Sequence, residues 1–497
     1  MFSILKSLRR FAGLGAMAGA ISVALLAPRA EASVTISSDA TKNMSCSGGV
    51  CSPTKNSAVL NVASLESMLK SGNATVTTTG SGNVQADDIV VDAALTWSSS
   101  SALALSAAES IAFNASVSVK GKGGLTLNDA GTKSLAFYDG AHVQFSNLSS
   151  ALTINGNPYA LVGTVAELAS GADANPTGYF ALAANYNAAG DGTYPSAPVQ
   201  NPGNWFTGVF EGLGNTISNL TIVDGTQSAG CDGLIFTIYS PIVSNIGMVN
   251  ISITSTGDQG ANGAGGILCD ANSNGLIWRS YATGSITMGR LDGAGGLEAG
   301  GAPIEQSWAN VNISGTNGST FGGLTTGVSS IDQSFSMGSV SCTVGSCQLG
   351  GLGENAGQGA TITNSYAVGA VTDGGAGGED SYVGGLLSQT GSGGSVAQSY
   401  AAGKITTPDS GCVNDTDCVG ALYGIDNTND NTQVYWDTTT THLDVAAGNE
   451  SSDPGTEGLN NKKFTAKLPK GFSKKIWAQN PGINKGLPYL IANPPPD

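Results

Sequence analysis

An eleven-residue phrase occurs five times in the second half of the chain, and its period constrains the fold more than any other feature. Each copy has a serine followed by an aromatic residue and ends in a β-branched residue and Ser or Thr. The serines of successive copies are 27, 27, 31 and 34 residues apart. A period of about 20 to 50 residues indicates a repeat array, in which one unit cannot bury its apolar face alone. The copies are IWRSYATGSIT from Ile277, IEQSWANVNIS from Ile304, IDQSFSMGSVS from Ile331, ITNSYAVGAVT from Ile362 and VAQSYAAGKIT from Val396.

A glycine pair followed by an apolar residue recurs between these phrases. Each unit therefore has a glycine pair, a short apolar strand, a turn and the aromatic-bearing strand. A propeller blade needs about 40 residues and four strands, so shorter units of varying length favour a parallel β-helix, where extra residues bulge at a corner. The pairs with their apolar residues end at Ile267, Leu297, Leu324, Leu352 and Leu386.

Alternate residues of each phrase differ in kind, as expected for a strand with two faces. From Ser280, every second residue is small or β-branched, whereas the other set starts with an aromatic residue and continues with Thr and Ser. The small set is expected to face a narrow core, and the rings to face outward or into a corner. Stacking at about 4.8 Å would align the rings in a ladder, which could bind sugars, although rings packed beneath turns are commoner. The predicted aromatic ladder is Tyr281, Trp308, Phe335, Tyr366 and Tyr400.

The first 32 residues predict a secretory signal peptide. Lys6, Arg9 and Arg10 precede the apolar run AGLGAMAGAISVALLA, and AEA ending at Ala32 is a small-x-small cleavage site. The run is short for a membrane span, which disfavours a retained anchor. We therefore expect an exported protein, at the cell surface, outside the cell or in the periplasm, with no membrane span in the mature chain.

The composition excludes some classes of fold and partner. The 497 residues include 72 glycines, and only 11% of residues are charged. Glycine on this scale, mixed with short β-branched runs, suggests many tight turns joining short strands. Without the signal peptide, the 20 basic and 36 acidic residues fall to 16 and 35, a net charge of −19. Such an acidic chain repels nucleic acid, so no nucleic-acid partner is expected.

Eight cysteines in an exported chain predict disulfides. A C-x4-C pair could instead hold zinc, but the chain has only two histidines, His142 and His442, far apart in sequence. Three pairs are close in sequence, and the last two cysteines lie in neighbouring repeats. The expected bonds are Cys46–Cys51, Cys231–Cys269, Cys342–Cys347 and Cys412–Cys418.

Several segments resemble known families of bacterial surface proteins. GGLGENAGQGATITNSYAVGAVT (350–372) resembles the GLUG motif, and WFTGVFEGLGNTISNLTI (205–222) is similar to the coil that opens such arrays. VYWDTTTT (434–441) and GFSKKIWAQNPGINKGLPYLI (471–491) resemble their usual C-terminal closure. ALTWSSSSALALSAAESIAFNASVSVKGKGGLTL (94–127) resembles the stacked strands of filamentous-haemagglutinin-like adhesins.

This resemblance implies a β-solenoid on or beyond the cell surface, usually assigned to adhesion, and it implies no catalytic activity. The expected partner is a host or matrix glycan or protein. Some GLUG-type repeats accompany immunoglobulin-A-cleaving metalloproteases, but the zinc-binding sequence H-E-x-x-H of such enzymes is absent from this chain.

The alternative function is that of a polysaccharide lyase or glycoside hydrolase, because β-helices also host such enzymes. Glycoside hydrolysis needs two carboxylates a few ångströms apart. The candidates are Asp87 with Asp88, or Asp292 with Glu298 and Glu305 from adjacent repeats. Acidic turn residues that solvate the surface are the favoured interpretation.

No cofactor is expected, and Ca²⁺ is the one metal worth weighing. DNTNDNTQ (426–433) and DSGCVNDTDC (409–418) gather oxygen ligands in turns, as hard cations require. Neither segment has the EF-hand spacing, and Asn and Asp are common in turns.

These observations predict an all-β fold, a right-handed parallel β-helix with a cap at each end, and a non-enzymatic adhesin or matrix-binding protein. Trp477, Pro488 and Tyr489 are expected in the C-terminal cap, since open sheet edges invite aggregation. The predicted regions are the signal peptide (1–32), a strand-rich N-terminal segment (33–160), a lead-in with a short helix (161–204), the GLUG-type repeats (205–445) and the C-terminal cap and tail (446–497).

Overall fold

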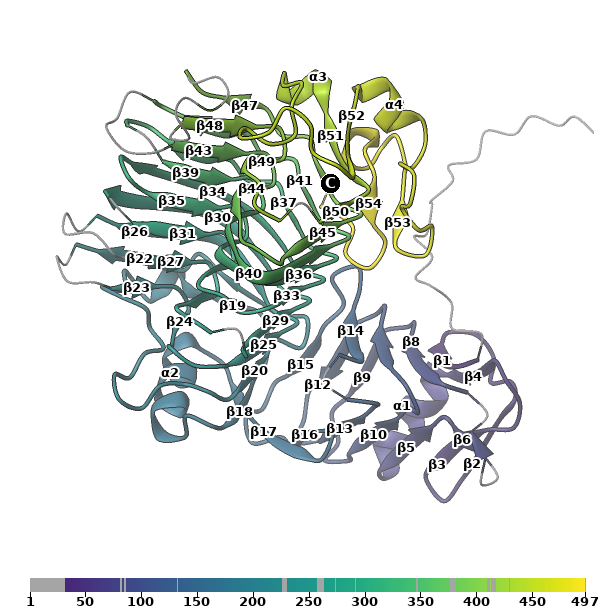
Figure 1. Ribbon diagram of the computed structural model, residues 1–497. Helices are drawn as coiled ribbons and strands as arrows, with labels where there is room; N and C mark the ends of the chain where they lie inside the picture. The colour runs from purple at the N-terminus through teal and green to yellow at the C-terminus, as the bar shows by residue number, and fades with distance from the viewer. Residues whose placement is uncertain are drawn as a thin grey trace, which may run out of the picture.

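The chain is mainly β strand in long parallel sheets, which confirms the all-β prediction (Figure 1). Only Ala32 of the predicted signal peptide is among the described residues, and within those residues no helix combines the length and the apolar character that a membrane crossing requires. The computed structural model describes residues 32–80, 86–131, 133–225, 230–256, 263–272, 274–290, 292–345, 347–375, 381–408, 412, 417–428 and 430–496, and the backbone of 83–84.

Successive repeats add strands to the same three parallel sheets (Figure 1). The first sheet contains β23 (Cys231–Asp232), β27 (Gly263–Gly265), β31 (Gly293–Gly295), β35 (Thr320–Gly322), β39 (Gln348–Gly350), β43 (Ser381–Gly384) and β48 (Asp417–Gly420). The second contains β24 (Ile235–Phe236), β25 (Ile242–Ser244), β28 (Leu268–Cys269), β29 (Leu276–Trp278), β32 (Glu298–Ala299), β33 (Ile304–Glu305), β36 (Thr325–Asp332), β40 (Gly353–Thr363), β44 (Leu387–Thr390), β45 (Ser395–Ala397), β49 (Tyr423–Ile425) and β50 (Asn431–Thr432).

The third sheet carries the aromatic-bearing part of the phrase. It contains β26 (Gly247–Ser255), β30 (Tyr281–Arg290), β34 (Trp308–Thr316), β37 (Phe335–Ser336), β38 (Val340–Cys342), β41 (Tyr366–Ala367), β42 (Val371–Asp373), β46 (Tyr400–Ala401), β47 (Ile405–Thr406) and β51 (Val434–Asp437). Each strand pairs in parallel with its counterpart in the next repeat; for example, Ile286 lies beside Ile313, and Ile313 beside Val340.

The serines of the phrase form a continuous column of hydrogen bonds between the second and third sheets. The backbone N–H of Ser307 donates to Ser334 Oγ at 3.1 Å, and that of Ser334 to Ser365 Oγ at 3.2 Å. Each hydroxyl also donates within its own repeat, as from Ser334 Oγ to the Asp332 carbonyl at 2.8 Å. The same pattern continues through Ser280 and Ser399.

The residue before each serine turns the chain from one sheet to the next. It has a positive φ in every copy, a region that non-glycine residues rarely occupy. A polar side chain stands at this corner each time. The corner residues are Arg279 (φ 46°), Gln306 (47°), Gln333 (46°), Asn364 (47°) and Gln398 (44°).

The two strand faces divide as the alternation predicts. Ala282 and Ile286 are fully buried, whereas Ser285 and Thr287 are exposed. The glycine pairs make room for the neighbouring repeat: a Cβ on Gly296 would lie 2.3 Å from the Gly323 carbonyl oxygen and 2.6 Å from the Ala309 Cβ.

The N-terminal segment has its own hydrophobic core and three further sets of parallel strands. The strands of these sets are β1 (Ser33–Ser37), β4 (Ala58–Asn61), β8 (Asp88–Val91), β11 (Ile111–Phe113) and β14 (Leu135–Phe137); β9 (Leu95–Trp97), β12 (Val117–Val119) and β15 (Val143–Phe145); and β3 (Val50–Pro53), β5 (Ala74–Thr77), β10 (Leu103–Ser106), β13 (Leu125–Asn128) and β16 (Leu152–Ile154).

Helix α1 (Val62–Ser71) in this segment was not anticipated from the sequence. The Asn61 side chain caps it by accepting from the Ser64 N–H at 3.1 Å. Leu65 and Leu69 are buried, so the helix covers one end of the N-terminal core. Two short pairs complete this region: β2 (Met44–Ser47) with β3, and β6 (Thr79–Gly80) with β7 (Asn83–Val84).

The lead-in connects the two strand stacks and contains the short helix expected there, α2 (Val165–Ala174). Backbone hydrogen bonds join the stacks: the Val143 N–H donates to the Leu213 carbonyl at 2.9 Å, and the Phe145 N–H to the Ala183 carbonyl at 2.7 Å. The other elements between the N-terminal strands and β23, some of them outside the lead-in itself, are β17 (Asn157–Val162), β18 (Tyr179–Leu182), β19 (Tyr186–Asn187), η1 (Ala188–Gly190), β20 (Val209–Glu211), β21 (Thr216–Ser218) and β22 (Thr221–Asp224).

The C-terminal segment covers the end of the repeats, as expected, and also their flank. At the end, the Leu422 N–H donates to the Ala446 carbonyl at 2.9 Å, and Ala446 and Ala447 are buried. β52 (Thr456–Leu459) extends the third sheet, whereas Trp477 packs against the rings of Tyr366 and Tyr400 on the flank of the repeats. The physical reason is that the aromatic ladder leaves an apolar flank that needs cover. The other elements are α3 (Thr438–Thr441), α4 (Asn461–Ala466), β53 (Trp477–Ala478), η2 (Asn484–Gly486) and β54 (Tyr489–Leu490).

Candidate functional site

The structure brings all five predicted ladder rings into one stack. Adjacent ring centroids are 4.5, 5.8, 4.7 and 4.9 Å apart from Tyr281 to Tyr400, and the planes deviate by 6° or less. Each inner ring therefore uses both faces on its neighbours. Tyr281, the first ring, lies over Gly247, where a Cβ would be 2.4 Å from the ring. The ladder thus offers ring edges, not faces, to any ligand at its side.

The C-terminal segment covers the later part of the ladder. Phe335, Tyr366 and Tyr400 are fully buried. Trp477 lies 5.9 Å from both tyrosine rings, and Tyr400 Oη donates to the Pro488 carbonyl at 2.6 Å. This part of the ladder is packing, the commoner of the two alternatives.

The first two rings, Tyr281 and Trp308, are only half-buried and line a cleft of about 540 Å³. Three distant parts of the chain meet there: the N-terminal segment around Tyr138, the first repeats, and the C-terminal tail from Ile491 to Pro496. This cleft is the candidate functional site. Its polar wall residues include Asp92, Asn114, Asp139, Asn245, Arg279 and Gln306.

Arg279 supplies the positive charge of the cleft. Its guanidinium carbon lies 4.9 Å from the centroid of the Tyr138 ring and 5.4 Å from that of Trp278, and Nη2 donates to Tyr138 Oη at 3.0 Å. These contacts hold the planar group in place. In the part of the chain that the structure describes, the single ion pair joins Lys133 to Glu305 at 2.5 Å, so no carboxylate is paired with Arg279.

Buried polar atoms without a hydrogen-bond partner gather at this cleft. They are Asn114 Oδ1, Arg279 Nε, Gln306 Oε1 and Asn493 Oδ1, all in residues that line it. An orphaned buried polar atom costs about 1–3 kcal/mol, so a cluster of them marks a place where ligand groups or ordered water complete the bonding. Burial also raises the pKa of the Tyr281 hydroxyl, which keeps it a neutral donor.

The carboxylates proposed for the enzymatic alternative do not share one environment. Asp292 and Glu298 are buried, and Glu298 accepts the Ala302 N–H at 3.0 Å. Glu305 is paired with Lys133. Asp88 accepts both the N–H and the hydroxyl of Ser110, at 3.0 and 2.5 Å, and Asp87 is half-buried beside it in sequence.

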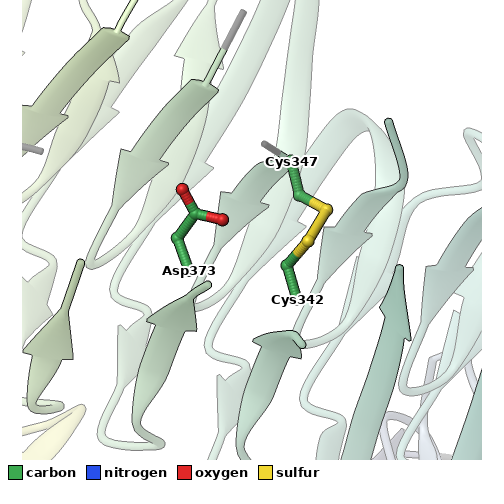
Figure 2. A group of neighbouring side chains, drawn as sticks. All are labelled: Cys342, Cys347 and Asp373. Atoms are coloured by element: carbon green, nitrogen blue, oxygen red, sulfur yellow. A yellow bond between two sulfur atoms is a disulfide. The ribbon is translucent and has the colours of Figure 1, made fainter. Parts of the chain in front are cut away.

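Figure 2 shows Asp373 beside the disulfide between Cys342 and Cys347. The sulfur and carboxylate atoms of these three residues lie within 4.8 Å of one another, which is the spacing of a metal ligand set. The sulfur atoms are bonded to each other and carry no thiolate charge, which a metal ligand needs. Asp373 also accepts from Ser381 Oγ at 2.7 Å. The group therefore does not offer a metal ligand set while the disulfide is intact.

The first calcium candidate, residues 426–433, forms a hydrogen-bonded turn. Asn431 Nδ2 donates to Asp426 Oδ2 at 2.7 Å and to Asp453 Oδ1 at 2.9 Å, so an amide N–H₂ stands between the carboxylates where a cation would need oxygen. Desolvation and the Asp426 charge raise the pKa of Asp453 to about 7. The second candidate, residues 409–418, lies mostly outside the described residues.

All eight cysteines are bonded, in the four pairs expected from spacing: Cys46–Cys51, Cys231–Cys269, Cys342–Cys347 and Cys412–Cys418. Four disulfides are compatible with an exported protein.

Sequence reasoning identified the ladder but missed the cleft. Tyr138 and Arg279 are 141 residues apart, and no periodic signal links them. A usable signal was the rarity of arginine: Arg279 and Arg290 are the only arginines after residue 32, and Arg279 occupies the corner position of a repeated phrase.

Comparisons with known proteins leave the family open. No family model matches the chain, and no curated protein matches it. Among solved structures, the chain is similar to one described as "a putative immunoglobulin A1 protease from Bacteroides ovatus", with 18% identity and a TM-score of 0.40 over 64% of this chain and 86% of the other. A similarity at this level carries no argument about fold or activity.

Proposed function

We propose that this chain is an exported, right-handed parallel β-helix that acts without catalysis as an adhesin or matrix-binding protein. The observation that supports this most is the unbroken register of the repeats, from Cys231 in the first sheet to Gly420. Connections between parallel strands of one sheet are right-handed in about 98% of cases, which supports the handedness. A stack of this kind is rigid and offers long side faces for binding.

One side face is suited to polar ligands. A shallow groove runs over the third sheet, where amide and hydroxyl side chains of successive repeats lie next to each other. Amides and hydroxyls both donate and accept hydrogen bonds, as glycans and extended peptides require. The groove is lined by Asn219, Thr221, Asn250, Ser252, Thr283, Ser285, Asn310 and Asn312.

Fractionation of cells that express a C-terminally tagged chain tests export. The proposal predicts a mature N-terminus at Ser33 and digestion of the tag by protease added to intact or outer-membrane-permeabilised cells. A tag protected in the cytoplasm, with residues 1–32 retained, would contradict it.

Binding is tested with the purified mature chain on immobilised collagen, fibronectin and a glycan array. Retention on one of these surfaces without release of product supports the proposal. Loss of binding after reduction of the disulfides would show that the folded array is the binding form.

A second candidate function is polysaccharide cleavage in the cleft. The observation that favours it is that two carboxylates, Asp92 and Asp139, line the same cleft. Incubation of the purified chain with polygalacturonate would then release reducing ends or unsaturated products. Asp92→Asn should abolish the release if this carboxylate reacts, whereas exposed Glu109→Asn should not.

A further inference from the structure

We infer that the cleft between the N-terminal segment, the first repeats and the C-terminal tail binds a short oligosaccharide that contains uronic acid, with Arg279 as its carboxylate ligand. This inference deepens the proposed binding function by naming a ligand class and a site. It rests on the fixed guanidinium of Arg279, the cleft's unsatisfied polar atoms and its size.

The charge argument concerns Arg279. The cleft is lined by one of only two arginines after residue 32, together with the carboxylates of Asp92 and Asp139. The guanidinium is fixed against Tyr138 and uses one nitrogen there, and the Nε–H has no partner. A guanidinium has five N–H donors in a planar fork that matches a carboxylate. A fixed guanidinium with donors to spare therefore selects an anionic planar group.

The hydrogen-bond argument concerns the other orphaned atoms. Asn114 Oδ1, Gln306 Oε1 and Asn493 Oδ1 are all acceptors. The matching ligand must therefore present hydrogen-bond donors as well as a carboxylate, and an acidic sugar does both. A phosphate or a simple carboxylate would satisfy Arg279 but would leave these three amide oxygens unpaired.

The partners of the same amides explain how the wall is held. Asn114 Nδ2 donates to Asp92 Oδ1 at 3.2 Å, and Asn493 Nδ2 donates to the Gln333 carbonyl at 3.0 Å. These bonds leave the amide oxygens as the unsatisfied ends. Because the orphaned atoms are shielded from solvent, a ligand pairs with them only when side chains of the cleft wall rotate aside.

Size and surface fit a short oligosaccharide. The cleft of about 540 Å³ lies in the range of about 300–1,000 Å³ that small-ligand sites occupy. The edges of Tyr281 and Trp308 add apolar contact, and aromatic edges carry partial positive charge that attracts hydroxyl oxygens. Ring stacking on a sugar is not required, since the ladder uses the ring faces.

Isothermal titration of the purified mature chain with trigalacturonate, trimannuronate and a hyaluronan tetrasaccharide tests the inference. At least one acidic probe should bind, and the methyl ester of the binding probe should bind about tenfold more weakly, since the ester loses a charge-assisted hydrogen bond. Arg279→Gln should weaken binding by about tenfold or more. Arg290→Gln, which removes the other, exposed arginine, should change it by less than about twofold.

A second variant guards against misfolding of Arg279→Gln. Gln306→Asn keeps an amide side chain, and asparagine tolerates the positive φ of this corner. The side chain is shorter by one methylene, so its oxygen no longer reaches the position of Oε1. Binding should therefore weaken about threefold while the melting temperature stays unchanged. Binding by no acidic probe at millimolar concentration, or equal loss in the Arg279 and Arg290 variants, would overturn the inference. Neither result would contradict export or adhesion through the side faces, which fractionation and surface binding test separately.

Discussion

Each serine of the column makes two hydrogen bonds through one hydroxyl, which alanine or glycine could not supply. Its hydroxyl donates to a carbonyl in its own repeat and accepts a backbone N–H from the preceding repeat. Ser334 donates to Asp332 and accepts from Ser307, whereas Ser280, the first of the column, accepts from Ile246. The column is buried, so water cannot replace a lost partner. This is why the serine returns unchanged while its neighbours vary.

Replacing Ser334 with alanine should therefore destabilise the fold. The variant orphans the buried Ser307 N–H, which costs about 1–3 kcal/mol. Urea unfolding followed by circular dichroism measures the loss. Ser285→Ala, on the exposed face of β30, is the matched control and should change stability by less than about 0.5 kcal/mol. Equal effects of the two substitutions would contradict the role of the column.

The corner residue before each serine makes a second prediction. Gln398 has a φ of 44°, where a β-branched side chain is strained. Gln398→Val should lower the free energy of unfolding by about 1–3 kcal/mol, whereas Gln398→Gly should be nearly neutral because glycine adopts this region freely. A valine variant as stable as the glycine variant in the same unfolding assay would show that the corner is not left-handed in solution.

The sequence allowed the serines and rings to be placed but not these corners. Positive φ is usually signalled by Gly, Asn or Asp, and only Asn364 among the five corner residues belongs to that group. Arg and Gln occupy the other four, so the backbone conformation follows from stacking between repeats instead of from local preference.

At the scale of elements, the C-terminal segment and the ladder stabilise each other. Trp477 is almost completely buried against Tyr366 and Tyr400, and its Nε1 donates to Asn364 Oδ1 at 3.3 Å.

The place of Trp477 on the flank could not be predicted, because a repeat pattern predicts which faces are apolar but not which distant segment covers them. The same limit concealed the cleft, whose walls come from three separate segments.

Trp477→Ala should destabilise the chain by about 3–5 kcal/mol, the usual cost of removing a fully buried aromatic side chain. It should also uncover the ladder, so a hydrophobic dye should bind the variant more strongly than the parent chain. Trp477→Phe retains the ring contacts and should lose much less stability. A dye signal unchanged in Trp477→Ala would mean that the segment does not shield the ladder.

At the scale of the whole molecule, buried carboxyl groups make stability depend on pH. Desolvation is the leading cause at each site and raises the pKa of Glu211 and Asp232 to about 7, and that of Glu354 to about 8. Desolvation likewise raises the pKa of Asp453 to about 7. Between about pH 4 and pH 8, these carboxyl groups stay protonated in the folded chain but are ionised in the unfolded chain. Folding is therefore favoured at the acidic end of this window and weakens as pH rises through the folded-state pKa values.

The melting temperature should accordingly fall as pH increases from 5 to 8. Each group contributes a slope of up to about 1.4 kcal/mol per pH unit. Glu354→Gln removes one such group and should flatten the profile, whereas Glu109→Gln, on an exposed residue, should leave it unchanged. A melting temperature that rises over this range in the parent chain would contradict the account.

The parallel pairing between repeats was the most predictable feature of the whole molecule. The five phrases required partners about thirty residues away, and the sheets pair with that spacing. The N-terminal segment gave less information because its strands are short and its phrases do not repeat, so helix α1 was overlooked.

The central claim is that consecutive repeats lie directly on each other, with residues such as Ser285 and Asn312 side by side on the exposed face. Adjacent strands are about 4.8 Å apart, close enough for a disulfide between substituted cysteines. Mild oxidation of the Ser285→Cys, Asn312→Cys variant should form this bond, detected by mass spectrometry of its proteolytic fragments. The Ser285→Cys, Ser339→Cys variant spans two repeats and should stay reduced at these positions. A bond in the second variant, or none in the first, would contradict the stacking on which the account depends.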